Sequence, residues 1–207
     1  MKLSLTALAA GLALFGSASA FAASTVDLTV TGLIVPSACT PSLSNGGVID
    51  HGKISAQDLS PDVDTQLPNH QMTLTVACDG TIAMALNAID NRAGSATDME
   101  YLFGLGLING TQKLGSFRIF ADDAIADGIP AKTIISRDAG ESWEADYLWS
   151  PNRYFSVAAQ DGPLQPIPIK NLSTTLTIGT FIAPSNNLDL SNEVSIDGSA
   201  TLEVKYL

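Results

Sequence analysis

After its first 22 residues, the sequence lacks any apolar run long enough to cross a membrane, which takes about 20 residues in a helix. It also lacks any later stretch in which apolar residues keep the 3.6-residue period of an amphipathic helix. These absences argue against a membrane-spanning helix and against a helical fold. They turn attention to β-structure.

Recognisable catalytic motifs are missing as well: there is no Gly-x-Ser-x-Gly elbow, no P-loop and no His-Glu-x-x-His. His51 and His70 have no nucleophile placed near them in sequence, so we interpret them as surface or turn residues rather than bases. Asp62 and Asp64 could be paired carboxylates or the edge of a calcium site, but the EF-hand loop pattern is absent and a solvated loop is favoured. We therefore expect no enzyme, no cofactor and no metal.

Positive charge is scarce. The sequence has ten Lys and Arg residues and 21 Asp and Glu residues, which gives a formal net charge of -11. An acidic protein is repelled by phosphate backbones and anionic lipids, so nucleic acid and lipid surfaces are not expected partners.

The first residues have the parts of a secretory signal peptide. Lys2 supplies the positive region, residues 3–15 are apolar and rich in Leu and Ala, and small residues at 18–20 and 20–22 offer cleavage sites. The apolar run is too short to span a bilayer of about 30 Å, so we predict a signal peptide over residues 1–22 and no membrane anchor. Loss of Lys2 changes the net charge from -11 to -12 and leaves one domain of roughly 185 residues.

Only two cysteines are present, Cys39 and Cys78. Behind a signal peptide an even pair predicts a disulfide formed in an oxidising compartment. The alternative is a zinc site, but only His51 and His70 could complete it, and their spacing matches no known ligand pattern. A bridge that closes a loop of about 40 residues contributes about 4 kcal/mol in the chain-entropy model.

Short runs of alternating apolar and polar residues have the period of a half-buried β-strand. They cover residues 72–76, 82–86, 117–120, 176–178 and 202–204. Turn signals bound them: Gly46-Gly47, Asp79-Gly80, Asn109-Gly110, Asp127-Gly128, Asp161-Gly162 and Asp197-Gly198. Many short strands between such turns predict an all-β sandwich or barrel in one domain.

Three segments depart from this pattern. Residues 122–127 could form one short helical turn. Three prolines in residues 163–169 exclude a central strand and predict an edge or a loop.

Five aromatic residues, including Trp143 and Trp149, cluster in residues 143–155. We favour packing in the core for this cluster. The alternative is a glycan-binding face, with Trp143 and Trp149 as the possible glycan contacts.

An alternating strand is predicted near each end of the mature chain. The first has Val26, Leu28 and Val30 on one face, followed by Gly32. Ordering about seven residues costs roughly 7–14 kcal/mol of backbone entropy. Burying three aliphatic side chains contributes only roughly 5–9 kcal/mol, so the strand needs a groove that supplies hydrogen bonds and apolar pockets.

The second end strand has Leu202, Val204 and Tyr206 on one face, with Glu203 and Lys205 on the other. A terminal strand with free N–H and C=O groups is a template for the addition of another strand. Together the two end strands predict a protein that pairs by strand addition with copies of itself or with a partner.

The residues that lead into the first cysteine resemble the start of chaperone–usher pilins: Val30-Thr-Gly-Leu-Ile-Val-Pro-Ser-Ala-Cys39. The second cysteine about forty residues later, within Leu74-Thr-Val-Ala-Cys78, and the penultimate tyrosine of Val204-Lys-Tyr206-Leu207 also resemble that family.

The middle of the chain resembles a narrower group, the GltF-like periplasmic proteins, which are grouped with fimbrial subunits. The matching segments are Ala38-Cys-Thr-Pro41, Asp50-His-Gly-Lys53, Asp90-Asn-Arg92, Phe103-Gly-Leu-Gly106, Asn109-Gly110, Lys113-Leu-Gly115 and Tyr206-Leu207.

The resemblance implies an immunoglobulin-like, Greek-key β-sandwich over residues 33–207 that lacks its last strand and is completed by a donor strand. Residues 23–32 would be the donor extension, with Val26, Leu28, Val30 and Gly32 donated to a neighbouring subunit. The strand with Leu202, Val204 and Tyr206 would line the acceptor groove and bind the chaperone.

The implied function is that of a structural subunit of a fimbria that serves cell adhesion. Its partners would be a periplasmic chaperone, an outer-membrane usher and neighbouring pilins. The protein would pass through the periplasm and end in a fimbrium at the cell surface. Two alternatives stay open: a self-contained periplasmic binding module whose N-terminal strand folds in cis, and a carbohydrate-binding tip subunit that uses Trp143 and Trp149.

Overall fold

The computed structural model describes residues 28–32, 38–97 and 101–207. Residues 35–207 form one compact unit and residues 1–34 a second one. The predicted signal peptide at 1–22 lies outside the described residues, as does Val26. Residues 28–32, the described part of the expected first strand, have no strand assignment.

The compact unit is made of β-strands, and no α-helix occurs in the described parts of the chain. The long strands are β1 (Cys39–Leu43), β3 (His70–Ile82), β4 (Met84–Asp90), β8 (Gly115–Ala126), β9 (Ile129–Ser136), β12 (Tyr154–Ala159), β13 (Ile169–Ile182) and β14 (Ala200–Tyr206). The two-residue strands are β2 (Thr65–Gln66), β5 (Phe103–Gly104), β6 (Leu107–Ile108), β7 (Gln112–Lys113), β10 (Glu144–Ala145) and β11 (Leu148–Trp149). Three short 3₁₀ turns cover Ser44–Gly47, Ala56–Asp58 and Ser185–Asn187.

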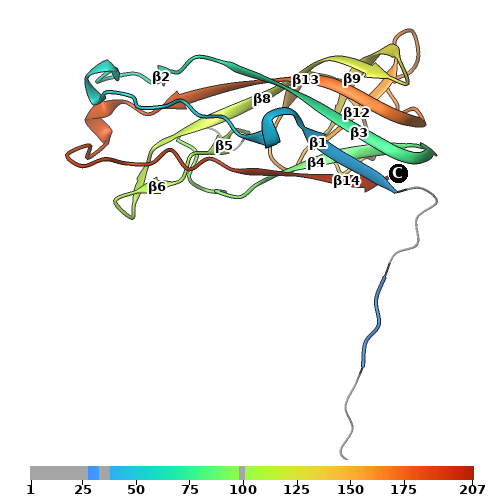
Figure 1. Cartoon of the computed structure of the whole chain (residues 1–207), viewed down its shortest axis with the longest axis horizontal. Coiled ribbons are helices and arrows are strands. Elements are labelled where there is room, and N and C mark those ends of the chain that lie inside the picture. Colours follow the sequence, from blue (N-terminus) through green and yellow to red (C-terminus); the bar gives the residue numbers. More distant parts are fainter. Residues whose placement is uncertain (1–27, 33–37, 98–100) are drawn as a thin grey trace, which may run out of the picture. The chain divides into compact units, whose positions relative to one another are not determined.

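The long strands pair in the order β1-β3-β13-β8-β9-β12-β4-β14, and every pair is antiparallel. The chain passes from one layer to the other at the β8–β9 hairpin, which gives a sandwich of two sheets (Figure 1). One layer holds β1, β3, β13 and β8, and the other holds β9, β12, β4 and β14. The predicted all-β, immunoglobulin-like sandwich is thereby confirmed.

The inner faces of the strands follow the alternation in the sequence. Along β3 the buried residues Met72, Leu74 and Val76 alternate with exposed ones. They pack in the core with Leu86, Phe155 and residues of β8 and β13. Period-two burial of this kind places one apolar face of each sheet against the other, as expected for a sandwich.

Two local predictions are wrong. Residues 122–127 belong to β8 and the turn that follows it, not to a helical turn, because β8 pairs with β13 through a register shift near Ser173 and Thr175. Asp79-Gly80 lies inside β3 rather than at a turn. By contrast, Asp127 and Gly128 form the predicted β8–β9 turn, with φ values of 49° and 82°.

The disulfide between Cys39 and Cys78 is confirmed. The two residues face each other in the β1–β3 register, so the bridge fastens the first strand of the domain to its neighbour. Among the described residues, no helix is long and apolar enough to cross a membrane.

Candidate functional site

One edge of the sandwich is open. β1 pairs with β3 and β14 pairs with β4, so each of these outer strands keeps one edge without a strand partner in the described part of the chain. The two strands come together at one end, where the Cys39 backbone N–H donates a 3.0 Å hydrogen bond to the Tyr206 hydroxyl. In Figure 1 β1 and β14 lie on the same side of the sandwich.

Between these strands a groove leads into the core. Its first part has a volume of about 240 Å³. Leu43 and Ile49 line one wall, and Ala200 and Leu202 line the other. Its floor consists of core side chains from β3, β8, β13 and the loop after β5: Met72, Leu105, Phe117, Ile119, Leu176 and Ile178.

A second, larger part of about 650 Å³ continues the groove toward the other end of the sandwich. Its lining includes Ile54, Leu59 and Val194, which are half-buried and pack against the core. Ile49, His51 and Ile196 line both parts, so the two volumes are neighbours along one path. The groove thus follows the edge where one further strand would complete the sandwich.

The residues predicted to line the acceptor groove belong to β14. Leu202, Val204 and Tyr206 are half-buried on the inner face, and Leu202 lines the groove. Glu203 and Lys205 lie on the outer face and form an ion pair with a 2.7 Å N···O distance. Inner apolar residues and an unpaired backbone edge are the two features that bind an added strand.

The predicted donor residues are described in part. Leu28 is 89% exposed and Val30 is 87% exposed. Apart from its chain neighbours, no described residue lies within 4 Å of the position that a Cβ on Gly32 would take.

Two histidines that the sequence gave no reason to pair meet at the groove. The His51 and His70 rings lie edge to face, with centroids 4.7 Å apart. His51 Nε2 lies 3.1 Å from Thr180 Oγ1 on the inner face of β13. Partial burial, and then the neighbouring His70, lower the pKa of His51, whereas Asp50 raises it.

A polar network that sequence reasoning missed holds the segment before β14. Arg92 donates two hydrogen bonds to the Asp197 carboxylate, of 3.0 and 2.8 Å. Asn91 donates to the hydroxyls of Ser199 and Thr201. The motif Asp90-Asn-Arg92, which carried part of the resemblance, therefore fixes one wall of the groove.

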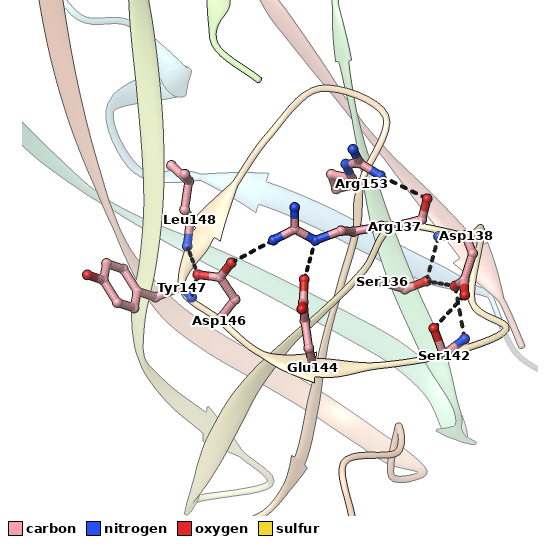
Figure 2. Close-up of polar contacts among 9 residues, drawn as sticks. All are labelled: Ser136, Arg137, Asp138, Ser142, Glu144, Asp146, Tyr147, Leu148 and Arg153. Carbon is pink, nitrogen blue, oxygen red and sulfur yellow. Dashed lines mark hydrogen bonds and ion pairs between the residues drawn. The ribbon is translucent and has the colours of Figure 1, made fainter. Parts of the chain in front are cut away.

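The opposite edge of the sandwich is closed by β10 and β11, which pair with β9 and β8. Figure 2 shows Arg137 between Glu144 and Asp146, with which it forms ion pairs. Nearby, Asp138 accepts hydrogen bonds from the Ser142 side chain and backbone and from Ser136. These bonds lower the pKa of Asp138 to about 2.

The aromatic cluster is divided between the core and the surface. Trp149 is completely buried, which agrees with the favoured core interpretation and contradicts its possible role as a glycan contact. Trp143 is half-buried and donates from its indole N–H to the Gly140 carbonyl at 3.2 Å. Only Tyr147 of this cluster is largely exposed, at 54%.

Within the described ranges, no group of three or more His, Cys, Asp or Glu side chains is arranged to hold a metal ion. Asp62 accepts a 3.0 Å hydrogen bond from Asn186, and both residues are exposed.

The chain is similar to known proteins over parts or most of its length. Residues 28–100, which include β1, β3 and β4, match the family described as "Protein of unknown function (DUF1120)". The chain is 28% identical to the uncharacterized protein YhcF of Escherichia coli K12, over 97% of this chain and 98% of that one. It is 27% identical to the protein GltF of the same organism, over 92% of each chain.

The chain is similar to GltF over most of its length. The predicted resemblance to this group is thus confirmed over nearly the whole sequence. The DUF1120 match ends at residue 100, so it includes the β1 wall of the groove and the Asp90-Asn-Arg92 segment but not β14.

Proposed function

We propose that this GltF-like protein is a structural subunit of a chaperone–usher fimbria or a similar surface fibre, assembled by donor-strand exchange. The observation that carries the proposal is the open edge between β1 and β14, where core side chains form the floor of a groove. A folded domain that leaves its core accessible along an unpaired strand edge is suited to receive a strand from another chain.

The groove offers what an isolated donor strand lacks. The unpaired edges of β1 and β14 offer backbone hydrogen bonds, and Leu43, Ile49 and Leu202 offer apolar contacts. In this role Val26, Leu28 and Val30 of one subunit enter the groove of the next. Before assembly, a periplasmic chaperone lends its own strand to the same groove, and an outer-membrane usher receives the complex.

The proposed role is structural, and no catalysis is part of it. The predicted signal peptide directs the chain to the periplasm, where the Cys39–Cys78 bridge forms. From there the subunit joins a fibre at the cell surface.

Deletion of residues 23–32 tests the role of the donor segment. We expect the truncated protein to co-purify with the chaperone, because its groove is intact, but not to be incorporated into fibres. Leu28→Asp should have the same effect in the full chain, because a carboxylate cannot enter an apolar pocket without a large desolvation cost. Thr29→Ala, on the opposite face of the predicted strand, is the matched control and should assemble normally. Normal assembly of the truncated protein would rule out donation by this segment.

A further inference from the structure

The outer face of the β1-β3-β13-β8 sheet carries an arginine with an unusual environment. Arg118 and Phe120 project to this face from β8, because the core residue Ile119 between them projects inward. The Arg118 guanidinium carbon lies 4.8 Å from the Phe120 ring centroid and 4.8 Å from that of Phe181 on β13. The guanidinium is therefore held between two aromatic rings.

A glycine makes this arrangement possible. Gly179 faces Arg118 in the β13–β8 register. A Cβ on Gly179 would lie 3.2 Å from Arg118 Nε and 3.2 Å from Asn69 Oδ1. The absence of a side chain at this position lets the arginine lie across β13.

Arg118 has no ion-pair partner in the described part of the chain. Among the described residues, no carboxylate pairs with it and no acceptor takes a hydrogen bond from it, and its Nε is buried without a partner. Only Arg92, Arg137 and Lys205 among the described Lys and Arg residues form ion pairs. Arg118 differs from the other unpaired cations in that its Nε is buried.

Aromatic rings and amides lie closest to Arg118, and the Asp122 carboxylate follows two residues after Phe120 on the same face of β8. The Tyr147 ring lies 5.2 Å from the Phe120 ring, and Figure 2 shows it pointing away from the Arg137 ion pairs. The exposed amides of Gln66 and Asn69, with a 3.1 Å hydrogen bond between them, lie on the Phe181 side. The face thus presents flat rings, one guanidinium and amide groups.

We propose that this face, formed by Tyr147, Phe120, Arg118 and Phe181, binds an acidic sugar residue of a surface glycan. The guanidinium takes the sugar carboxylate, because a planar fork of donors matches the two carboxylate oxygens. The rings cover the apolar C–H face of the pyranose, and the amides bind its hydroxyls. Polymers with a high density of negative charge are disfavoured, because the full sequence has a formal net charge of -11 and repels them.

The site lies on the outer face of a sheet, away from the groove between β1 and β14, so it does not depend on the proposed assembly mechanism. It differs from the glycan contacts that the sequence suggested, because Trp149 is buried in the core. Tyr147 is the member of the same aromatic cluster that reaches this face.

Binding of N-acetylneuraminic acid and of glucuronic-acid oligosaccharides to the purified mature protein tests the proposal, with neutral glucose oligosaccharides and a poly-glutamate peptide as comparison ligands. We expect affinity for at least one acidic sugar that exceeds the affinity for its neutral counterpart by about tenfold or more. Added salt should weaken binding. No binding of either acidic sugar at millimolar concentration, or equal binding of the neutral sugar or the peptide, would overturn the proposal.

Variants locate the site. Arg118→Lys keeps the charge but loses the planar fork, and it should lower the affinity about tenfold. Tyr147→Ala removes an exposed ring that the fold does not need and should weaken binding about threefold or more. Tyr101→Ala, at an aromatic residue that is 45% exposed elsewhere, is the matched control and should bind as the parent does. Unchanged binding by the folded Tyr147→Ala and Arg118→Lys variants would place the sugar elsewhere and refute the assignment.

Discussion

At the scale of single residues, the burial and neighbours of His51 in the groove wall affect its protonation. His51 is held between the Thr180 hydroxyl and the His70 ring, and both histidines are half-buried. Protonation of the His51 ring would place a positive charge in a partly desolvated wall. Neutral His51 is therefore the form that suits the folded groove.

Protonation of His51 links the stability of the groove to pH. Its pKa is lowered in the folded protein, so the unfolded chain binds more protons as the pH falls through about 6.5. The His51 contribution to stability is complete above that pH and is lost as the pH decreases toward the lowered value. We expect the thermal midpoint to fall between pH 7 and pH 5, and His51→Gln to reduce that fall. An identical decrease in the variant would assign the effect to other groups.

Asp138 gives a second prediction at this scale, with an acidic group. Hydrogen bonds from Ser142 and Ser136 hold its pKa at about 2, below the value of an unfolded aspartate, near 4. The stabilisation is present above that unfolded value and disappears as the pH falls toward about 2. An NMR titration of the Asp138 carboxyl should give a midpoint near 2. In Asp138→Asn, hydrogen exchange at residues 138–142 should be faster at neutral pH, and unchanged exchange would show that these bonds do not order the loop.

At the scale of strands, the sequence predicted those elements whose pattern is local. β14 was predicted as Ala200–Tyr206 from its alternation, and the disulfide from the cysteine pair. The helical turn at residues 122–127 was wrong because a register shift within the β13–β8 ladder depends on a partner about fifty residues away. Asp79-Gly80 failed as a turn signal for a similar reason, since it lies within β3 at a register shift of the β13–β3 ladder.

The disulfide fixes β1, and its removal should act on that strand first. Cys39 and Cys78 are 39 residues apart, and in the chain-entropy model a bridge over such a loop contributes about 4 kcal/mol. We expect the Cys39→Ala/Cys78→Ala double variant to lose about that much free energy of unfolding in denaturant titrations. Hydrogen exchange should increase most in β1, because β3 remains paired with β13. The reduced parent protein is the control and should behave like the variant, whereas equal exchange in β1 and β3 would contradict this order.

At the scale of the whole molecule, an open edge was implied by the family resemblance, but residue patterns alone could not predict it. Its walls come from residues 43–59 and 190–202, and its floor from three other strands and the loop after β5, so no local pattern describes the groove. Likewise, Thr180 is 129 residues from His51 in the chain. The sequence could predict two end strands with an unpaired edge, because alternation and terminal position are local properties. That β1 and β14 meet at one edge follows only from the pairing of all the strands between them.

An open groove makes stability depend on an added strand, which a synthetic peptide can test. We expect a peptide of residues 23–32 to bind protein that lacks these residues and to raise its unfolding free energy, by about 2.7 kcal/mol at a concentration one hundred times the dissociation constant. A peptide with Asp in place of Leu28 and Val30 is the matched control and should have no effect, because its charges cannot be buried. If the truncated protein is as stable as the full chain and gains nothing from the peptide, the groove is not a strand acceptor. If the full chain is a monomer whose stability exceeds that of the truncated protein at every concentration, the strand completes its own domain instead of a neighbour's.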